Sequence, residues 1–443
     1  MKRAALGIVA ILSVTVFIIP EVSAELDTTT VDSASSVFMF LCSLLVFIMA
    51  PAIALFYGGM LRKQSMTSMM AQCIGVMAVV GIIWWVVGYS LAFGTGNGFI
   101  GSLEYAFGSG TSISEGNGTI PTAEFLVFQG TFAIVTSCIV FGATAERVRF
   151  SAILAFLALW SFLVYAPMAH MVWGGGFLSD GLSSIGLPVQ DFAGGTVVHI
   201  CSGISGVAAA IAIGKRSDRI IKGRSHNVPL MFIGCVLLWI GWFAFNCGSE
   251  GGFDDIAVLA MENTFLASCA STIVWIVIQH LHIGRVSVTG LCAGVLAGLV
   301  GITPGCGFVD TWAAVIIGAV AAVVCYFGII MMRKRKNIDD ALDVMGLHGL
   351  GGIWGAISVG IFSVASLSWE GNGGLIAGQV DLLAGQIISV VVTLVYCFIV
   401  SFVLMKIVDY VAKKINGKGA ALTEEEQMVG SDTVDHGEPS YLM

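Results

Sequence analysis

Two histidines lie inside apolar stretches of this sequence, where buried polar side chains are uncommon. His199 follows Asp191 by eight residues in DFAGGTVVHI, and His348 follows Asp343 by five residues in LDVMGLHGLGG. A neutral imidazole donates and accepts hydrogen bonds, so two facing rings could share a proton and form a polar strip in an apolar lumen. A single buried histidine is more often satisfied by a backbone carbonyl, but the matched placement of these two favours a joint role. No third ligand has a suitable spacing, and we therefore expect no metal site.

Asp191 and Asp343 stand where the two histidine-bearing helices are expected to begin. A carboxylate at a helix N-terminus accepts hydrogen bonds from free backbone N–H groups and interacts favourably with the helix dipole. A negative charge in the same place could also help to desolvate and hold a cation. The sequence leaves both roles open for both carboxylates.

Aromatic side chains and one hydroxyl lie in neighbouring apolar segments. They are Phe128 and Phe132 in FQGTFA, Trp173 in AHMVWGGG, and Trp242, Phe245 and Ser249 in IGWFAFNCGSE. A tryptophan near the end of an apolar segment is usually an interfacial anchor, but Trp, Phe and a hydroxyl together also describe a site for a small cation. A cation–π contact contributes about 0.5–2 kcal/mol, which is less than the free energy needed to move an ion into hydrocarbon. Such a site recruits a cation but cannot carry it through an apolar pore, unless the cation sheds its charge as ammonium does.

The composition places these residues in a membrane protein. Of the 443 residues, 57% are hydrophobic and 11% are charged, whereas a soluble domain carries about 25% charged residues. Mean hydropathy is +0.94, and the 56 glycines suit close helix packing in a bilayer. The 11 cysteines have no CxxC pair or metal-ligand spacing, so we interpret them as packing residues.

The elements that must position these residues are predicted from hydropathy. Residues 1–24 resemble a signal peptide, with a basic start, an apolar run and a small-residue cleavage site; an uncleaved extra span is the alternative. After it, about eleven segments reach the roughly 20 apolar residues that a membrane-spanning helix needs. These expected spans are 34–57, 68–94, 123–144, 150–172, 193–213, 228–247, 256–279, 287–304, 310–332, 344–365 and 383–411.

The basic residues predict the orientation. Apart from Lys2 and Arg3, every lysine and arginine lies at the end of an odd-numbered span or in the loop that follows it. The positive-inside rule makes that side cytoplasmic, so we expect a multi-pass protein of the inner (plasma) membrane with its mature N-terminus outside and its C-terminus in the cytoplasm.

The two halves of the chain share features that indicate an internal repeat. The fifth and tenth spans each carry one histidine, and the first and sixth close on aromatic residues followed by small ones, in ALFYGG and GWFAFNCGS. Because each block has five spans, the second block must be inverted relative to the first. The predicted fold is therefore an all-α inverted 5+5 repeat with a final helix, typical of transporters whose site lies at the repeat interface.

Motifs along nearly the whole chain resemble the ammonium transporter (Amt/Mep/Rh) family, and its bacterial ammonium transporters more than its Rh branch. They are ALFYGGM, AERVRFSA, AHMVWGGG, DFAGGTVVHI, IGWFAFNCGS, AGLVGITPGCG and LDVMGLHGLGG. The resemblance implies a transmembrane domain over 25–412 that assembles as a homotrimer with one pore per subunit. It also implies roles for individual residues: an outer ammonium site of Trp173, Phe128 and Ser249 beside Asp191, a stacked gate of Phe132 and Phe245, a pore of His199 and His348, and supporting positions at Trp242 and Asp343.

The last residues, 413–443, resemble the family's cytoplasmic regulatory tail. The matching positions are Gly430, His436, Gly437, Glu438 and Tyr441, although the usual Gly-Leu-Asp is Gly430-Ser431-Asp432 here. The resemblance implies that the nitrogen-signalling PII protein binds at the cytoplasmic exit. Composition alone, which is acidic and polar, would favour a disordered tail.

Together these features favour electrogenic ammonium uptake, in which ammonium binds outside, is deprotonated near the gate and passes the histidines as ammonia, with the proton on a separate polar route. A passive ammonia channel and an ammonium sensor that signals through its tail are the alternatives. We expect no enzyme, because the chain has no nucleophile–base set and no cofactor loop. We also expect no cofactor and no nucleic-acid partner.

Overall fold

The structure is a computed structural model that describes residues 31–114, 116–221 and 225–441. The predicted signal peptide, 1–24, lies outside the described residues. Eleven helical segments among them are long and apolar enough to cross a membrane, which confirms the predicted number.

These segments are built from α2 (Ser33–Met60), α3 (Met66–Ile83) with α4 (Tyr89–Phe93), α5 (Thr122–Gly142), α6 (Phe150–Trp160) with α7 (Ala166–Trp173), α8 (Cys201–Ile213), α10 (Val228–Cys247), α11 (Asp255–Ile283), α12 (Val288–Ile302), α13 (Thr311–Arg333), α14 (Leu350–Phe362) and α15 (Asp381–Asn416). Short elements complete the fold: α9 (Asp218–Ile221), α16 (Glu424–Val429) and the hairpin of β1 (Gly116–Asn117) and β2 (Ile120–Pro121).

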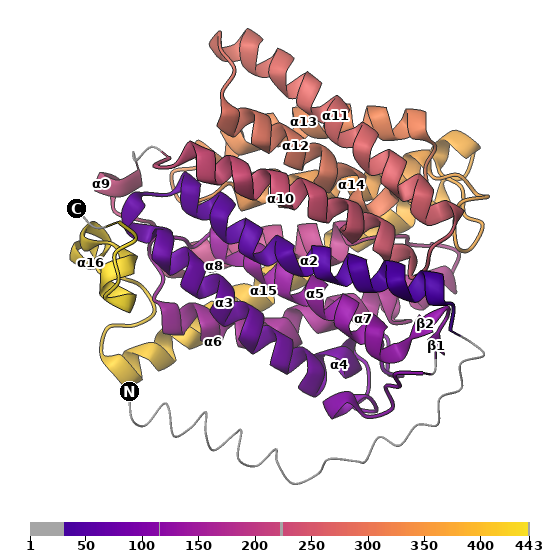
Figure 1. Cartoon of the computed structure of the whole chain (residues 1–443), viewed down its shortest axis with the longest axis horizontal. Coiled ribbons are helices and arrows are strands. Elements are labelled where there is room, and N and C mark those ends of the chain that lie inside the picture. The colour runs from indigo at the N-terminus through magenta and orange to yellow at the C-terminus, as the bar shows by residue number, and fades with distance from the viewer. Residues whose placement is uncertain (1–30, 115, 222–224, 442–443) are drawn as a thin grey trace.

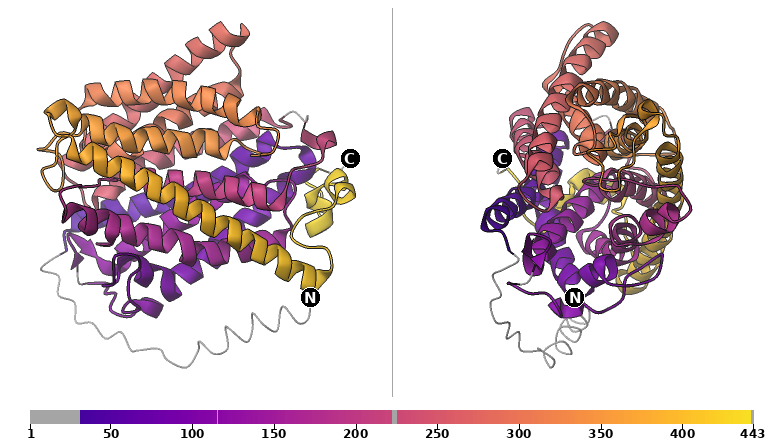
Figure 2. Two further views of the ribbon diagram at one scale, coloured as in Figure 1. Left: turned by 180° about the vertical axis from the view of Figure 1, so that it is seen from behind. Right: turned by 90° about the vertical axis from the view of Figure 1, so that its right-hand side faces the viewer.

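The spanning helices lie side by side along roughly one direction, with α9 and α16 at one end and the β1–β2 hairpin at the other (Figure 1). Seen from behind, α15 crosses the bundle obliquely and ends beside the C-terminal tail (Figure 2). The ends of this bundle are therefore different surfaces: one carries the tail, and the other carries the loops around the hairpin.

Helices form here because hydrocarbon offers no partner for backbone N–H and C=O groups, which must then be satisfied within the segment. Polar side chains cap the first turns of several of these helices. Asp32 accepts from the N–H of Ser35 in α2, and Asn227 accepts from the N–H of Leu230 in α10. Such caps satisfy the free donors of a first turn.

Burial separates a central set of helices from an outer one. Most of α5, α8 and α12 is buried inside the bundle, whereas most of α3, α11 and α15 is not. The outer helices expose large apolar side chains such as Ile74, Ile273 and Ile399, which are 55–68% exposed. Apolar faces of this extent are typical of helices that contact lipid or another subunit.

Candidate functional site

The turn that carries His199 is held by the carboxylate of Asp191. Its two oxygens accept hydrogen bonds from the four consecutive backbone N–H groups of residues 194–197, at 2.7–3.3 Å. Gly194 adopts a φ of +114°, which only glycine adopts without strain. Asp191 is 2% exposed, so its carboxylate serves the helix start from inside the protein.

The second half of the chain repeats this arrangement with a different aspartate from the expected one. Asp340, not Asp343, accepts from the N–H groups of Val344 and Met345, at 3.0 and 2.7 Å. Asp343 instead pairs with Arg333 at the end of α13. Asp340 precedes His348 by eight residues, the same interval as Asp191 and His199. The expectation that Asp343 is the counterpart of Asp191 was therefore wrong. Of the three aspartates before His348, the equal interval of eight residues identifies Asp340 as the counterpart.

Both histidines lie in π-helical turns, Gly195–Ile200 before α8 and Met345–Gly349 before α14. The start of α8 approaches the second of these turns closely, since a Cβ on Gly203 would lie 2.5 Å from the Gly349 backbone. This close approach brings the Nδ1 atoms of His199 and His348 to 3.3 Å from each other. Only one of the two Nδ1 atoms can carry the shared hydrogen, so the tautomers of the rings are linked.

A small apolar cavity of about 20 Å³ lies against the two imidazoles, with side chains of α2, α5 and α10 around it. That volume is enough for one water-sized molecule. Trp242 stacks on His199 at a centroid distance of 5.3 Å and is oriented by a hydrogen bond from its Nε1 to Thr303 Oγ1 at 2.9 Å. The Nε2 atom of His199 is buried without a hydrogen-bond partner in the described structure, so it is free to contact a molecule in this space.

Two stacked phenyl rings lie beside this cavity, on the side of the residues expected to form the outer cation site. Phe132 and Phe245 stack at a centroid distance of 4.1 Å and an interplanar angle of 19°, and both are at most 1% exposed. Phe245 also lines the cavity beside the histidines. The stacked rings therefore lie between the cavity beside the histidines and the side chains of Trp173 and Phe128.

The residues expected to form an outer cation site lie on the other side of the stacked rings. Trp173 and Phe128 each contact Phe132, at centroid distances of 6.3 and 4.9 Å. Trp173 and Ser249 line an outer hollow of about 270 Å³. Ser249 Oγ donates to the carbonyl of Phe245 at 2.9 Å, which leaves its oxygen able to accept from a cationic N–H group.

Asp191 reaches this outer site through its backbone rather than its carboxylate. Its carbonyl oxygen accepts from Trp173 Nε1 at 2.8 Å, while its carboxylate is turned to the N–H groups of the helix start. One residue thus fixes both the indole at the outer hollow and the turn that leads to His199.

The similarity of this chain to known proteins identifies its family. A model of the Ammonium Transporter Family matches residues 37–441. The chain belongs to the ammonium transporter family. An ammonium transporter of Bacillus subtilis is 43% identical over 92% of this chain and 98% of its own length, and one of Aquifex aeolicus is 39% identical over 93% and 94%.

Solved structures of similar proteins support the assignment of this chain to the ammonium transporter family. Mep2 of Candida albicans superposes with a TM-score of 0.81 at 33% identity, over 90% of this chain and 88% of that one. A structure titled "Sensor Amt Protein" superposes with a TM-score of 0.80 at 27% identity, over 90% and 97%. The Bacillus subtilis and Aquifex aeolicus relatives are named as transporters and not as enzymes, which fits the expectation of a non-enzyme.

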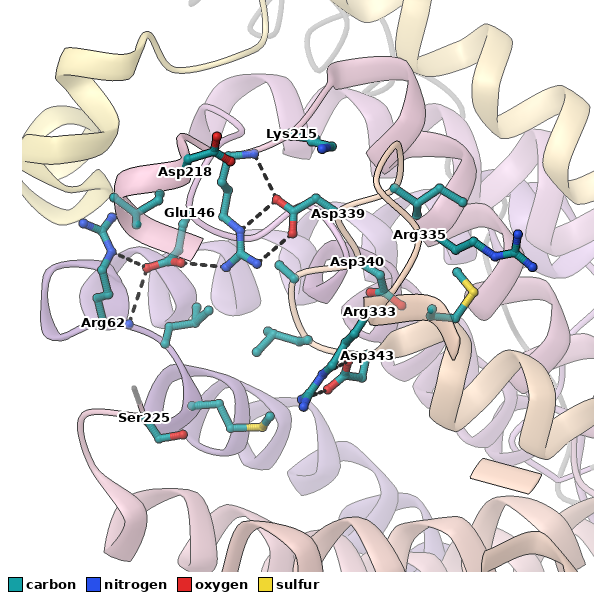
Figure 3. A pocket seen from close by; sticks show the side chains of 18 of the residues that line it. Arg62, Glu146, Lys215, Asp218, Ser225, Arg333, Arg335, Asp339, Asp340 and Asp343 are labelled. Carbon is teal, nitrogen blue, oxygen red and sulfur yellow. Dashed lines mark hydrogen bonds and ion pairs between the residues drawn. The ribbon is translucent and has the colours of Figure 1, made fainter. Parts of the chain in front are cut away.

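At the tail end of the transporter a vestibule of about 550 Å³ opens among charged side chains (Figure 3). Arg216 is its hub, because it pairs with Glu146 and with Asp339, both at 2.8 Å. Glu146 also pairs with Arg62 at 2.9 Å. Burial would raise the pKa of Asp339, but the Arg216 and Arg147 guanidinium groups lower it to about 2. The hydropathy pattern did not predict this network, since its members come from four separate loops.

Burial, together with the nearby carboxylate of Asp343, raises the pKa of Asp340 to about 7. The folded state therefore binds more protons than the unfolded chain between about pH 4 and pH 7, and this group's contribution to stability is lost as the pH rises through that window. We expect Asp340→Asn to flatten the fall in melting temperature from pH 5 to pH 8. Asp218 is an exposed carboxylate on the same vestibule, and Asp218→Asn is the control. If the melting temperature fell equally with pH in the wild-type protein and in both variants, the group that titrates would not be Asp340.

The tail is ordered, contrary to what its composition alone favours. Residues 420–422 pair with residues 147–149 through backbone hydrogen bonds, Arg149 N–H to Ala420 and Leu422 N–H to Arg147, at 2.9 and 2.8 Å. Glu426 binds Arg149, and the carbonyl of Gln427 accepts from Arg62 at 2.9 Å. The tail is thereby connected to the charged network of the vestibule.

Further contacts fasten the residues expected to form the regulatory motif. Gly430 adopts a φ of +104° at the end of α16. Two residues later, Asp432 accepts from the N–H of Ser68 in the first turn of α3, at 2.8 Å. His436 packs edge-on against Phe150 at a centroid distance of 5.0 Å, and the Tyr441 hydroxyl lies 3.0 Å from His226 Nε2. Gly437 follows with a φ of +65°, and Glu438 N–H donates to the Asp432 carbonyl at 3.4 Å.

The ion pair of Glu426 and Arg149 is expected to hold the tail in place. Charged hydrogen bonds of this kind contribute more than neutral ones, but the pair is partly exposed, so we expect Glu426→Gln to speed amide hydrogen exchange in residues 420–441 only about fivefold. Glu424→Gln is the matched control in the same helix, because its pair with Arg219 is exposed. Equal exchange in both variants would show that the backbone pairing alone fastens the tail.

Proposed function

We propose that this ammonium transporter separates ammonium into ammonia and a proton at its aromatic gate, and conducts the ammonia past His199 and His348. The observation that carries the proposal is the pair of imidazoles 3.3 Å apart beside a cavity of about 20 Å³. A hydrated cation does not fit in a space that holds one water-sized molecule. Ammonia fits, and it can exchange hydrogen bonds with the free Nε2 of His199.

Recruitment of the cation is assigned to the outer hollow. Trp173 and Phe128 present ring faces or edges beside Ser249, and cation–π contact contributes about 0.5–2 kcal/mol, more where water is excluded. That free energy selects and concentrates ammonium but does not carry charge through the stacked rings. Deprotonation at the gate removes the charge, so that neutral ammonia passes the rings without the free energy needed to bury an ion.

The proton is proposed to cross by a separate polar route, which makes uptake electrogenic. Transport currents test this: proteoliposomes on a solid-supported membrane should give a current on an ammonium jump, and sodium or potassium jumps of equal size should not. Ammonium uptake without a current would favour a passive ammonia channel.

A sensor is the second candidate, favoured by the likeness to the structure titled "Sensor Amt Protein" and by the fastened tail. Binding of ammonium with neither current nor tracer flux would support it. The same proteoliposome preparation, with ammonium binding measured by calorimetry, separates the two functions.

The orientation and the partners are proposed on the same grounds. The lysines and arginines gather at the loops next to the tail, which supports a cytoplasmic C-terminus and an external N-terminus in the plasma membrane. The family resemblance supports a homotrimer and a PII protein that binds at the vestibule and tail. A native mass of three subunits, and binding of purified PII that is lost when residues 420–443 are removed, are the expected results.

A further inference from the structure

The outer hollow has more aromatic surface than the expected ammonium site accounts for. It measures about 270 Å³, whereas the cavity beside the histidines measures about 20 Å³. Five aromatic side chains line it, and of these only the tryptophan of the expected ammonium site has a role so far. They are Phe93, Phe125, Trp173, Phe192 and Trp369. The hollow can therefore hold a molecule that is too large for the inner cavity.

Trp369 joins this lining from the loop between α14 and α15. Its side chain is 54% exposed, yet it contacts two buried rings. It stacks on Phe192 at a centroid distance of 5.6 Å and an interplanar angle of 22°, and it meets Phe308 edge-on at 4.8 Å. A tryptophan that is already held in place offers ring surface to a ligand with little further loss of conformational freedom.

Two consecutive residues position both indoles of the hollow. The carbonyl of Asp191 accepts from Trp173 Nε1 at 2.8 Å, and the ring of the next residue, Phe192, supports Trp369. Phe192 is itself closely packed, because a Cβ on Gly307 would lie 2.1 Å from its ring. The two indoles are therefore fixed by one short segment, as a preorganised binding site requires.

The charge of the hollow favours a cation. Asp180 and Glu370 are exposed carboxylates on its wall. Glu370 accepts from two neutral groups, Asn372 Nδ2 and Ser183 Oγ, at 3.1 and 3.4 Å, so these partners leave its charge uncompensated. The described residues that line the hollow include no lysine, arginine or histidine. Aromatic ring faces and uncompensated carboxylates together attract positively charged ligands.

Quaternary ammonium ions have the chemistry that matches this lining. They carry no N–H group, so they gain nothing from a hydrogen-bond acceptor such as Ser249 Oγ and are recognised through aromatic faces instead. Their alkyl groups remove apolar ring surface from water when they bind. Unlike ammonium, they have no proton to lose and keep their charge wherever they go.

We propose that the outer hollow binds quaternary ammonium ions against Trp173 and Trp369, with Asp180 and Glu370 beside them, and that these ions block the transporter. They cannot continue to the histidines, because they exceed the inner cavity and cannot shed their charge. The inference rests on the proposed role of the hollow as the entrance for ammonium, but binding of the ion is measured without transport.

Calorimetry of the purified full chain in detergent tests the binding. The ligand is choline, and the control ligand is dimethylbutanol, in which carbon replaces the charged nitrogen. We expect choline to bind about tenfold more tightly than dimethylbutanol, and Trp369→Ala to weaken choline binding about tenfold. Trp369→Phe keeps a ring and is expected to lose only about threefold. Trp312→Ala removes a similarly exposed tryptophan outside the hollow and is the control variant.

Currents in proteoliposomes test the block. Choline is expected to raise the ammonium concentration needed for half-maximal current without lowering the maximal current, and to give no current itself. The same choline concentration should have little effect on Trp369→Ala, while size-exclusion profiles and melting temperatures establish that this variant is folded. Ammonium currents are first recorded without choline, so a failure of the proposed transport is seen separately from a failure of the block.

Four outcomes would overturn the proposal. Equal affinity for choline and dimethylbutanol would make the hollow an apolar pocket without selectivity for cations. Unchanged choline binding in folded Trp369→Ala would place the site elsewhere. A current carried by choline would make it a substrate rather than a blocker, and a choline effect on the maximal current alone would place its site outside the entrance.

Discussion

Replacement of both His199 and His348 with alanine is expected to abolish selective ammonium transport. The two imidazoles fill the space beside a cavity of about 20 Å³, and their loss would open room for a chain of water molecules. A hydrated lumen removes the penalty that excludes ions from an apolar one. We expect selectivity for ammonium over potassium to fall by about two orders of magnitude, on the order of 3 kcal/mol of discrimination, measured as the ratio of currents in proteoliposomes.

The control for this variant removes two other histidines. His280 and His282 lie in the last turns of α11, and His282 contacts the hydroxyl of Tyr326 rather than the pore. His280→Ala with His282→Ala should keep the wild-type current ratio. An unchanged ratio in the pore double variant would remove the histidines from the mechanism.

The single variants add a test of the shared hydrogen. Because the Nδ1 atoms lie 3.3 Å apart, either single replacement leaves the other ring without its partner. The effects of the two single replacements should therefore exceed, when added, the effect of the double replacement. Additive effects would show that the rings act independently.

Asp191→Asn is expected to destabilise the transporter and to stop transport. The amide NH₂ would face backbone N–H groups that now bind a carboxylate oxygen, so donors would oppose donors in a buried place. Buried hydrogen bonds to a charged group contribute about 1.5–3 kcal/mol each, and we expect the free energy of unfolding to fall by about 3 kcal/mol or more. The measurement is the melting temperature in detergent, with transport measured in parallel.

A second aspartate separates the two roles that the sequence leaves open for Asp191. Asp180 is an exposed carboxylate on the same outer hollow. Asp180→Asn removes a negative charge from the outer hollow without uncapping a helix, so it should leave the melting temperature unchanged. If Asp191→Asn kept its stability and only raised the ammonium concentration needed for half-maximal current, its role would be the electrostatic one.

Much of the architecture follows from the sequence, because hydropathy reports the length of each span directly. The eleven helices and the stretches with the phenyl rings, Trp173 and the histidines are predictable in this way. The partner of each polar side chain is harder to predict. Asp340 lies in a run with Asp339 and Asp343, and only folding decides which carboxylate meets the free N–H groups of the next helix.

The tail shows the same limit at longer range. Its acidic composition predicts disorder, yet Glu426 pairs with a residue 277 positions earlier in the chain. Such a contact depends on where α6 begins and where α15 ends, which no local pattern reports. The φ of +104° at Gly430 is the local feature that ends α16 before the contact of Asp432 with Ser68.

The wide turns that carry the histidines have a consequence for rotation about the helix axis. A residue added to or removed from an α-helix turns every side chain beyond it by about 100°. The π-helical turns at Gly195–Ile200 and Met345–Gly349 each hold the histidine eight residues after the carboxylate that anchors the turn. A one-residue deletion between anchor and histidine that left the type of turn unchanged would rotate the imidazole by about 100°, away from its partner. In each half of the protein, the angular position of the imidazole is therefore set by the number of residues in the interval as well as by their identity.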